Sequence, residues 1–366
     1  MTNSAYIIAA HRSPVIPKGG AFAHLQIHEL AAPVIRACLN TANISPEKVG
    51  ELILSNAVGA GGNPARLAAL AAGLPERIGG LSIDRQCTGG LDAIWLAAQM
   101  VKSGTHDIVV AGGAESASRR PIRMRTFLDG SPPAPYDRPD FTGISGRDPD
   151  MITSAAQIAE NMSVSRHIQE DWAINSHTRA RSANFQNEIT AIHDQNTDTF
   201  TRTLNTKTCA RAPVLAGTIT SATTAVDADA AACVIVVSAR IAKSYPNAIR
   251  IIQGAMLGGT PDQPALAPLA AIQSVLDQSK IAAQTLQSVE IMEAYAAQAI
   301  IAAQSQSFDP KAVNKGGGAL ARGHAIGASG AILAVRLYHE LQKTGGAGLA
   351  AIAAAGGLGS ALILHA

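Results

Sequence analysis

The chain has 366 residues, of which 47% are hydrophobic and only 15% are charged, so it can bury a large core and is not intrinsically disordered. A formal net charge of +2 gives no basis for nucleic acid as the main partner. The cysteines are widely scattered and form no Cys-x-x-Cys pair, so we expect neither a metal site nor a disulfide framework: Cys38, Cys87, Cys209 and Cys233. The first residues lack the layout of a signal peptide, and no apolar run is long enough to span a bilayer. We therefore expect a cytoplasmic protein without membrane contact.

The N-terminal part alternates between strand and helix patterns. Residues 6–10 and 51–54 are short apolar runs typical of strands. Residues 28–43 have the periodicity of a helix, and Asn63-Pro64 is a start signal for an Ala-rich helix over residues 65–72. Such alternation predicts a layered α/β protein.

The segment around Cys87 combines a small-residue turn, a helix and a strand. Cys87 stands directly before Thr88-Gly89-Gly90, and apolar residues at 91, 94, 95, 98 and 101 then mark one helix face. Gly104 ends that helix, and residues 107–111 are typical of a buried strand ending in Gly112-Gly113. Because a helix N-terminus favours the thiolate, Cys87 is a candidate nucleophile. A buried core cysteine is the competing interpretation.

The composition changes in the middle of the chain, after Gly113. Residues 114–150 are rich in Pro, Gly, Arg and Asp and are predicted to be loop. Amphipathic helices are predicted over residues 153–162 and from about residue 168, and residues 190–213 are polar and irregular. We interpret this part as a cap inserted into the α/β body, where ligand contacts often lie. Sheet-like sequence resumes at residues 231–237.

The last third repeats the order of parts found around Cys87. A helix begins at residues 327–330 and ends at Gly345-Gly346, and the strand pattern at 349–352 runs into Gly356-Gly357. The unequal spacing favours a duplicated α/β half over a solenoid repeat. The glycine-rich loop 314–327 carries His324, and its combination with a cysteine at a helix start favours a catalytic over a structural histidine.

These motifs together resemble the thiolase family of acyl-CoA acyltransferases, over nearly the whole chain. The motifs are HRSP, NPARLAALAAGLP, the Cys87 turn, AGGAES, GGGALARGHAIGASG and AGGLG. The resemblance implies a five-layered αβαβα fold made of two duplicated halves with an inserted loop domain. It places the N-terminal half at residues 1–115 plus about 214–240, the inserted domain at 116–213 and the C-terminal half at 241–366. It also implies a homodimer or homotetramer in lipid metabolism that takes acyl-CoA as a substrate and holds no cofactor tightly.

The resemblance assigns roles to three positions of this chain. Cys87 matches the nucleophile that carries the acyl group as a thioester, and His324 matches the histidine that activates the sulfur. The chemistry needs both, because a neutral thiol is a weak nucleophile and an imidazole supplies the base. The backbone N–H groups of Cys87 and Ala355 match the oxyanion hole.

Two single residues and one three-residue stretch depart from the family pattern. Ala353 stands where the family has a second cysteine that moves the proton on the α-carbon of the attacking group. Met292 replaces the asparagine of the Asn-Glu-Ala-Phe motif, which reads Met-Glu-Ala-Tyr here, and Thr223-Thr224-Ala225 replaces an Asn-Ala-Ser stretch that contacts pantetheine. Neither alanine nor methionine can transfer a proton or hold a water strongly. Acyl loading onto Cys87 survives these changes, whereas ordinary thiolysis or Claisen condensation is put in doubt.

Further binding residues are suggested more weakly. Met292 and Tyr295 are candidates for the wall of the acyl pocket. The phosphates of coenzyme A could meet an arginine cluster, for which a solvated basic face is the alternative: Arg119, Arg120, Arg123 and Arg125. His177 and Arg179 on the cap helix are similar candidates.

The sequence is compatible with three functions. The first is a thiolase-type acyltransferase that forms or cleaves a C–C bond by an altered proton route. The second keeps Cys87 and His324 but transfers the acyl group to a decarboxylating nucleophile or to an oxygen or nitrogen nucleophile. The third is a non-catalytic thiolase-like subunit that binds acyl-CoA.

Overall fold

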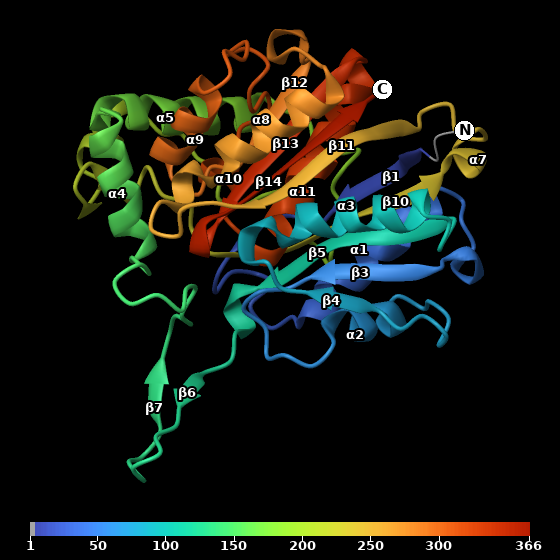
Figure 1. Cartoon of the computed structure of the whole chain (residues 1–366), viewed down its shortest axis with the longest axis horizontal. Coiled ribbons are helices and arrows are strands. Elements are labelled where there is room, and N and C mark those ends of the chain that lie inside the picture. The colour runs from blue at the N-terminus through green and yellow to red at the C-terminus, as the bar shows by residue number, and fades with distance from the viewer. Residues whose placement is uncertain (1–3) are drawn as a thin grey trace.

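A computed structural model describes residues 4–366 and shows two similar halves joined through one large sheet (Figure 1). Within these residues the strand order is β12-β13-β14-β11-β1-β10-β5-β3-β4, and β2 pairs with β10. The first half contributes β1 (Ala5–Arg12), β2 (Ile16–Pro17), β3 (Glu51–Ser55), β4 (Leu81–Ile83), β5 (Ile108–Ser116) and β10 (Ala228–Ser238). The second half contributes β11 (Ile249–Gly258), β12 (Ser288–Ile291), β13 (Ala347–Ala354) and β14 (Leu358–His365). A short antiparallel pairing between β1 and β11 connects them.

Helices and sheet form the five layers that the family resemblance implied. The central layer is α3 (Gly89–Lys102) and α11 (Ile326–Thr344), whose apolar residues share one core with strands of both halves. The helices α1 (Ile27–Thr41) and α2 (Pro64–Ala71) cover the outer face of the first half. The outer face of the second half is covered by α8 (Ala267–Ser279) and α9 (Ala296–Gln304). The predicted helices and strands of both halves are therefore confirmed, with small shifts at their ends.

The first turn of α3 and the second turn of α11 are in backbone contact, and glycine makes this possible. A Cβ on Gly90 would lie 2.6 Å from the nitrogen of Ala331, and one on Gly330 would lie 2.5 Å from the nitrogen of Leu91. Side chains cannot fit at such distances, so both positions need glycine. Cys87 lies just before α3, and the loop with His324 lies just before α11. The contact between the helices therefore brings these two loops together.

The prediction that the strand after α3 ends at Gly112-Gly113 was wrong. β5 continues through both glycines to Ser116. A Cβ on Gly112 would meet the carbonyl oxygen of Ala232 at 2.0 Å, and one on Gly113 would meet that of Gly327 at the same distance. These glycines serve close packing against β10 and the start of α11, not a turn.

The chain between β5 and β10 contains a projecting hairpin and a small helical unit. The hairpin, β6 (Arg123–Arg125) and β7 (Ala134–Tyr136), extends away from the body in Figure 1. The prediction of loop throughout residues 114–150 was therefore wrong at these two strands and at the end of β5. The helices α4 (Met151–Asn161) and α5 (Arg166–Ser182) pack against α9, and the remaining short elements are α6 (Thr206–Ala210), β8 (Val214–Ala216) and β9 (Ile219–Thr220). Elsewhere, α7 (Ala239–Ala242) follows β10 and α10 (Ala319–Arg322) precedes His324.

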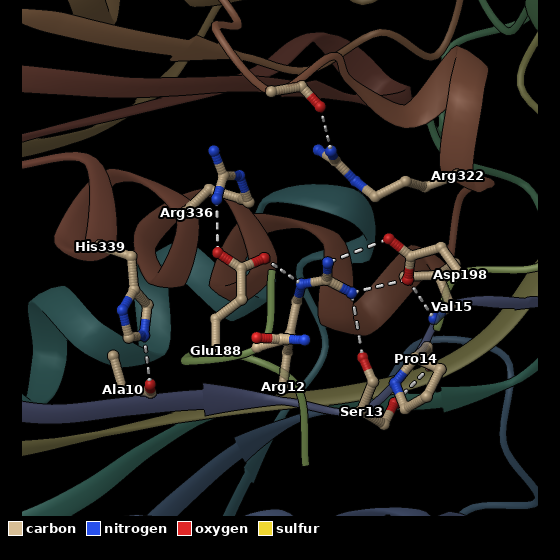
Figure 2. A network of polar contacts seen from close by, with 12 residues as sticks. Ala10, Arg12, Ser13, Pro14, Val15, Glu188, Asp198, Arg322, Arg336 and His339 are labelled. Carbon is tan, nitrogen blue, oxygen red and sulfur yellow. Dashed lines mark hydrogen bonds and ion pairs between the residues drawn. The ribbon is translucent and has the colours of Figure 1, made fainter. Parts of the chain in front are cut away.

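A buried ionic network ties the irregular segment 188–198 to β1 and α11 (Figure 2). Glu188 accepts a hydrogen bond from Arg12 Nε at 2.7 Å and another from Arg336 Nη1. The Asp198 carboxylate accepts hydrogen bonds from both Nη groups of Arg12, at 2.7 and 3.0 Å, and from the backbone N–H of Val15, at 2.8 Å. Because all of these side chains are buried, each charge depends on its partners, and the network fixes α11 relative to the first half.

No helix within residues 4–366 is long and apolar enough to cross a membrane.

Candidate active site

Cys87 and His324 meet where the two central helices begin. The Sγ atom of Cys87 lies 3.1 Å from Nε2 of His324, although the residues are 237 positions apart in sequence. Cys87 belongs to a short 3-10 turn, Gln86–Thr88, which leads directly into α3. The preceding residue Gln86 has a φ of 48°, a conformation that non-glycine residues seldom adopt, and its N–H is held by Asp84 Oδ1 at 2.9 Å. This strained turn sets the direction of the Cys87 side chain.

The hydrogen bonds of His324 determine which of its ring nitrogens faces the sulfur as an acceptor. Nδ1 lies 2.7 Å from Oγ of Ser329, and that hydroxyl donates its proton to the carbonyl oxygen of Ala325 at 3.0 Å. A serine hydroxyl has one proton, so Ser329 must accept from Nδ1–H. Nε2 is then unprotonated and can accept the thiol proton of Cys87.

Burial keeps both partners neutral at rest. It raises the pKa of the Cys87 thiol to about 12, and the charges of Glu115, Asp84 and Asp227 act in the same direction. It also lowers the pKa of His324 to about 4, against a smaller opposing effect of Asp227. A thiol and a neutral imidazole in contact therefore face the substrate, and the proton must move during the reaction.

Glu115, at the end of β5, holds the loops on either side of this pair. Its carboxylate accepts hydrogen bonds from Asn56 Nδ2 at 2.6 Å, from the backbone N–H of Ala57 at 3.0 Å and from that of Gly327 at 2.9 Å. Its side chain is fully buried, and burial raises its pKa to about 7 although the backbone donors lower it. Since Gly327 lies in the first turn of α11, three residues after His324, Glu115 positions the histidine loop.

Glu293, from the Met-Glu-Ala-Tyr motif, fixes the same loop from the other side. It accepts hydrogen bonds from Ser176 Oγ at 2.7 Å, from Asn314 Nδ2 at 2.8 Å and from Trp172 Nε1 at 3.0 Å. These contacts join α5 of the insertion to the start of the glycine-rich loop. The glutamate therefore has a structural function, and its carboxylate is occupied.

The two positions that depart from the family's catalytic pattern, Ala353 and Met292, are both buried. Ala353 is paired with Gly359 across β13 and β14, and its exposed fraction is 9%. Met292 is 1% exposed and belongs to the core between the two halves. Ala355, proposed for the oxyanion hole, follows β13 directly and precedes Gly356 and Gly357, both of which have positive φ.

Tyr295 lies at the start of α9 and close to the reactive sulfur. Burial raises the pKa of its phenol, and the neighbouring groups Asp150, Cys87 and Asp227 act in the same direction. Its hydroxyl is therefore protonated at neutral pH and can donate a hydrogen bond but cannot act as a base.

The predicted coenzyme A contacts are spread over the insertion. Arg119 and Arg120 lie just after β5, whereas Arg123 and Arg125 lie on β6 of the projecting hairpin. The weaker candidates on α5, His177 and Arg179, both form hydrogen bonds with the backbone. His177 Nδ1 accepts from the backbone N–H of Arg202 at 3.2 Å, and Arg179 donates to the carbonyl oxygen of Val313 at 2.5 Å.

Comparison with known proteins assigns the whole chain to one group. Residues 5–240 match the family description "Thiolase, N-terminal domain" and residues 245–366 match "Thiolase, C-terminal domain". The chain belongs to the thiolase family. This thiolase is 35% identical to "Putative acetyl-CoA C-acetyltransferase YhfS" of Bacillus subtilis (strain 168), with 99% of each chain covered. It is 31% identical to "Putative acetyl-CoA C-acetyltransferase VraB" of Staphylococcus aureus (strain MRSA252), with the same coverage.

Two crystal structures support the same conclusion. The acetyl-CoA acetyltransferase of Bacillus anthracis superposes with a TM-score of 0.91 at 28% identity, and 100% of this thiolase and 99% of that chain are covered. Human mitochondrial 3-ketoacyl-CoA thiolase in complex with CoA gives a TM-score of 0.90 at 26% identity, with 100% and 98% covered. The chain is thus an acyltransferase of the thiolase type, and its fold is the predicted thiolase fold.

Several residues that shape the site are not identified by the sequence pattern. Ser329, which sets the histidine tautomer, stands in a run of small residues at a helix start, where a serine is ordinary. Glu115 lies in the AGGAES motif, and a charged residue at the end of a long apolar strand is a signal that could have identified it. Gln86 gave no signal, because its positive φ is visible only in three dimensions.

Proposed function

We propose that this thiolase loads an acyl group from acyl-CoA onto Cys87 and transfers it in the formation or cleavage of a C–C bond. The observation that supports this most is the 3.1 Å contact between Cys87 Sγ and His324 Nε2, with Ser329 holding Nδ1. In the loading step the thiol proton passes to His324 Nε2 and the sulfur attacks the thioester carbonyl. The bond to coenzyme A sulfur breaks, and the leaving thiolate takes the proton back from His324.

The backbone N–H groups of Cys87 and Ala355 form the oxyanion hole in this proposal. They come from the turns before α3 and after β13, which lie in the two halves. Two such donors stabilise the negative oxygen that forms when sulfur adds to the carbonyl.

The route of the second proton is altered. Ala353 has no group that can take a proton from the α-carbon, and the buried side chain of Met292 cannot orient a water. If C–C chemistry occurs, another group must supply the base.

Loading can be tested by incubating the protein with acetyl-CoA and with longer acyl-CoAs and measuring its intact mass. The proposal predicts one acyl adduct per chain in the wild type and none in Cys87→Ala. The matched control is Cys209→Ala, which removes another cysteine and should keep the adduct. An adduct that persists in Cys87→Ala, or no adduct with any acyl-CoA, contradicts the proposal and favours a non-catalytic subunit.

The absence of a base at Ala353 supports a second candidate function, acyl transfer to a nucleophile that needs no such base. A decarboxylating nucleophile generates its own carbanion, and an oxygen or nitrogen nucleophile needs none, so neither requires a base at Ala353. This candidate predicts that the loaded enzyme reacts with malonyl-CoA, or with an alcohol or amine, but catalyses no thiolysis of acetoacetyl-CoA. Thiolysis that appears only in Ala353→Cys would support it.

Assembly and location complete the proposal. We propose a cytoplasmic homodimer or homotetramer that functions in lipid metabolism. The edge strand β4 and the neighbouring helix α2 expose three leucines that fit a second copy of the chain: Leu67, Leu70 and Leu81. Sedimentation of the wild type and of Leu67→Glu should give different masses if this face is an interface.

A further inference from the structure

The lost cysteine at position 353 raises the question of which group could replace it as a base. A replacement must lie close to Cys87, must be ionised at neutral pH and must be free to reach a substrate. The carboxylates whose charges act on Cys87 are Glu115, Asp84 and Asp227.

Glu115 and Asp84 do not meet the requirements. Glu115 is fully buried, and its oxygens are occupied by Asn56 and by backbone N–H groups. Asp84 is exposed, but its carboxylate accepts the backbone N–H of Gln86 and so caps that turn. Within the described residues its charge is not among those that shift the pKa of His324 or of Tyr295. Glu115 is therefore shielded from substrate, and the Asp84 carboxylate is already engaged by the backbone N–H of Gln86.

Asp227 lies on a short extended segment that runs between Tyr295 and His324. At one end, Thr224 is paired with Tyr295, and Ala225 N–H donates to the carbonyl oxygen of Ala294 at 3.0 Å. At the other end, Asp227 itself is paired with His324. His324 N–H donates to the Val226 oxygen at 2.7 Å, and Ala228 N–H donates to the His324 oxygen at 3.2 Å.

This pairing determines the direction of the Asp227 side chain. Residues directly opposite each other in a bridge point to the same face, so the carboxylate of Asp227 lies on the side of the His324 ring. That ring contacts Cys87 Sγ. The backbone geometry therefore places Asp227 on the same face as the reactive pair.

The electrostatics agree with this placement. The charge of Asp227 contributes to the raised pKa values of Cys87 and Tyr295 and opposes the lowering of the His324 pKa. Among the three carboxylates it alone acts on all three side chains. Its residue is exposed, and within residues 4–366 its carboxylate takes part in no hydrogen bond or ion pair. It is thus open to substrate and not committed to a structural contact.

We propose that Asp227 is the base that replaces the second cysteine in the C–C bond-forming step of this thiolase. The inference rests on the proposed loading of Cys87. The carboxylate takes a proton from the α-carbon of a second acyl-CoA, and the resulting enolate carbon attacks the thioester carbonyl on Cys87. The C–C bond forms, the C–S bond to Cys87 breaks, and the proton held by Asp227 passes to the leaving thiolate. In thiolysis, the reverse reaction, Asp227 takes the proton of the Cys87 thiol and gives it to the α-carbon when the C–C bond breaks.

Exchange of α-carbon protons tests this role directly. The wild type is incubated with acetyl-CoA in D₂O, deuterium in the acetyl group is followed by mass spectrometry, and acyl loading is measured in the same samples. Asp227→Asn should lower the ratio of the exchange rate to the loading rate by about 100-fold or more. The double variant Asp227→Asn/Ala353→Cys should recover exchange, because it restores a thiol at position 353, where the family has its second cysteine.

Each result separates the two proposals. No loading in the wild type overturns the proposed function. Loading without exchange in the wild type, or an exchange-to-loading ratio in Asp227→Asn within about threefold of the wild-type ratio, overturns the role of Asp227 and leaves the loading proposal intact. Lost exchange that Ala353→Cys does not restore shows a structural effect of the substitution and also overturns that role.

Discussion

Replacing His324 by alanine should slow acyl loading strongly, and the pH dependence should change with it. The Cys87 thiol has its pKa raised to about 12 by burial and by Glu115. At about pH 7.5 roughly one molecule in 30,000 would then carry a thiolate without help from a base. General base catalysis by a positioned imidazole is worth about 10²- to 10⁴-fold. We expect His324→Ala to reduce the loading rate within that range.

The slope of rate against pH distinguishes this explanation from a loss of structure. The pKa of His324 is lowered to about 4, so its neutral form is present throughout the neutral range, and wild-type loading should be nearly flat from about pH 6 to 9. In His324→Ala only the thiolate reacts, so its loading rate should rise about tenfold per pH unit over the same range. Rapid-quench measurement of coenzyme A release gives both profiles. A variant that loads within about threefold of the wild type, with a flat profile, would refute the reasoning.

Two further predictions concern the buried carboxylates. Although burial opposes it, the charges of the two neighbouring arginines lower the pKa of Glu188 to about 2, so Glu188→Gln should cost about 3–5 kcal/mol in urea unfolding. The control Asp107→Asn breaks an exposed pair and should cost less than about 1 kcal/mol; equal losses would contradict the network's role. Burial raises the pKa of Glu290 from 4.5 to about 7, so its contribution to stability is present below about pH 4.5 and is lost as the pH rises through 7. Between those values the wild type should lose about 2–3 kcal/mol relative to Glu290→Gln, and parallel stability curves would show the prediction to be wrong.

The periodic elements of the fold were accessible from sequence because their apolar spacing reflects burial directly. α3 and α11 show this best, since both are preceded by small residues and followed by glycine. Gly112-Gly113 misled the prediction because close backbone approach and a turn both select glycine. Only the neighbouring strand and helix decide between them.

Site residues could be predicted from the sequence where the side chain itself performs the chemistry. Cys87 and His324 could be named from their motifs, and the structure places them in contact. Asp227 could not be named, because an aspartate before an apolar strand is ordinary in sequence. Its proposed role as a base depends on a backbone pairing with His324, which is 97 positions away in sequence (324 − 227).

The most direct test of the central claim is the number of coenzyme A molecules released in the first turnover. After rapid mixing with acetyl-CoA and no second substrate, the wild type should release a burst of one coenzyme A per chain. Peptide mapping should then find the acetyl thioester on Cys87. The same burst in Cys87→Ala, or an acetyl group mapped to another residue of the wild type, would contradict the claim that Cys87 carries the acyl group.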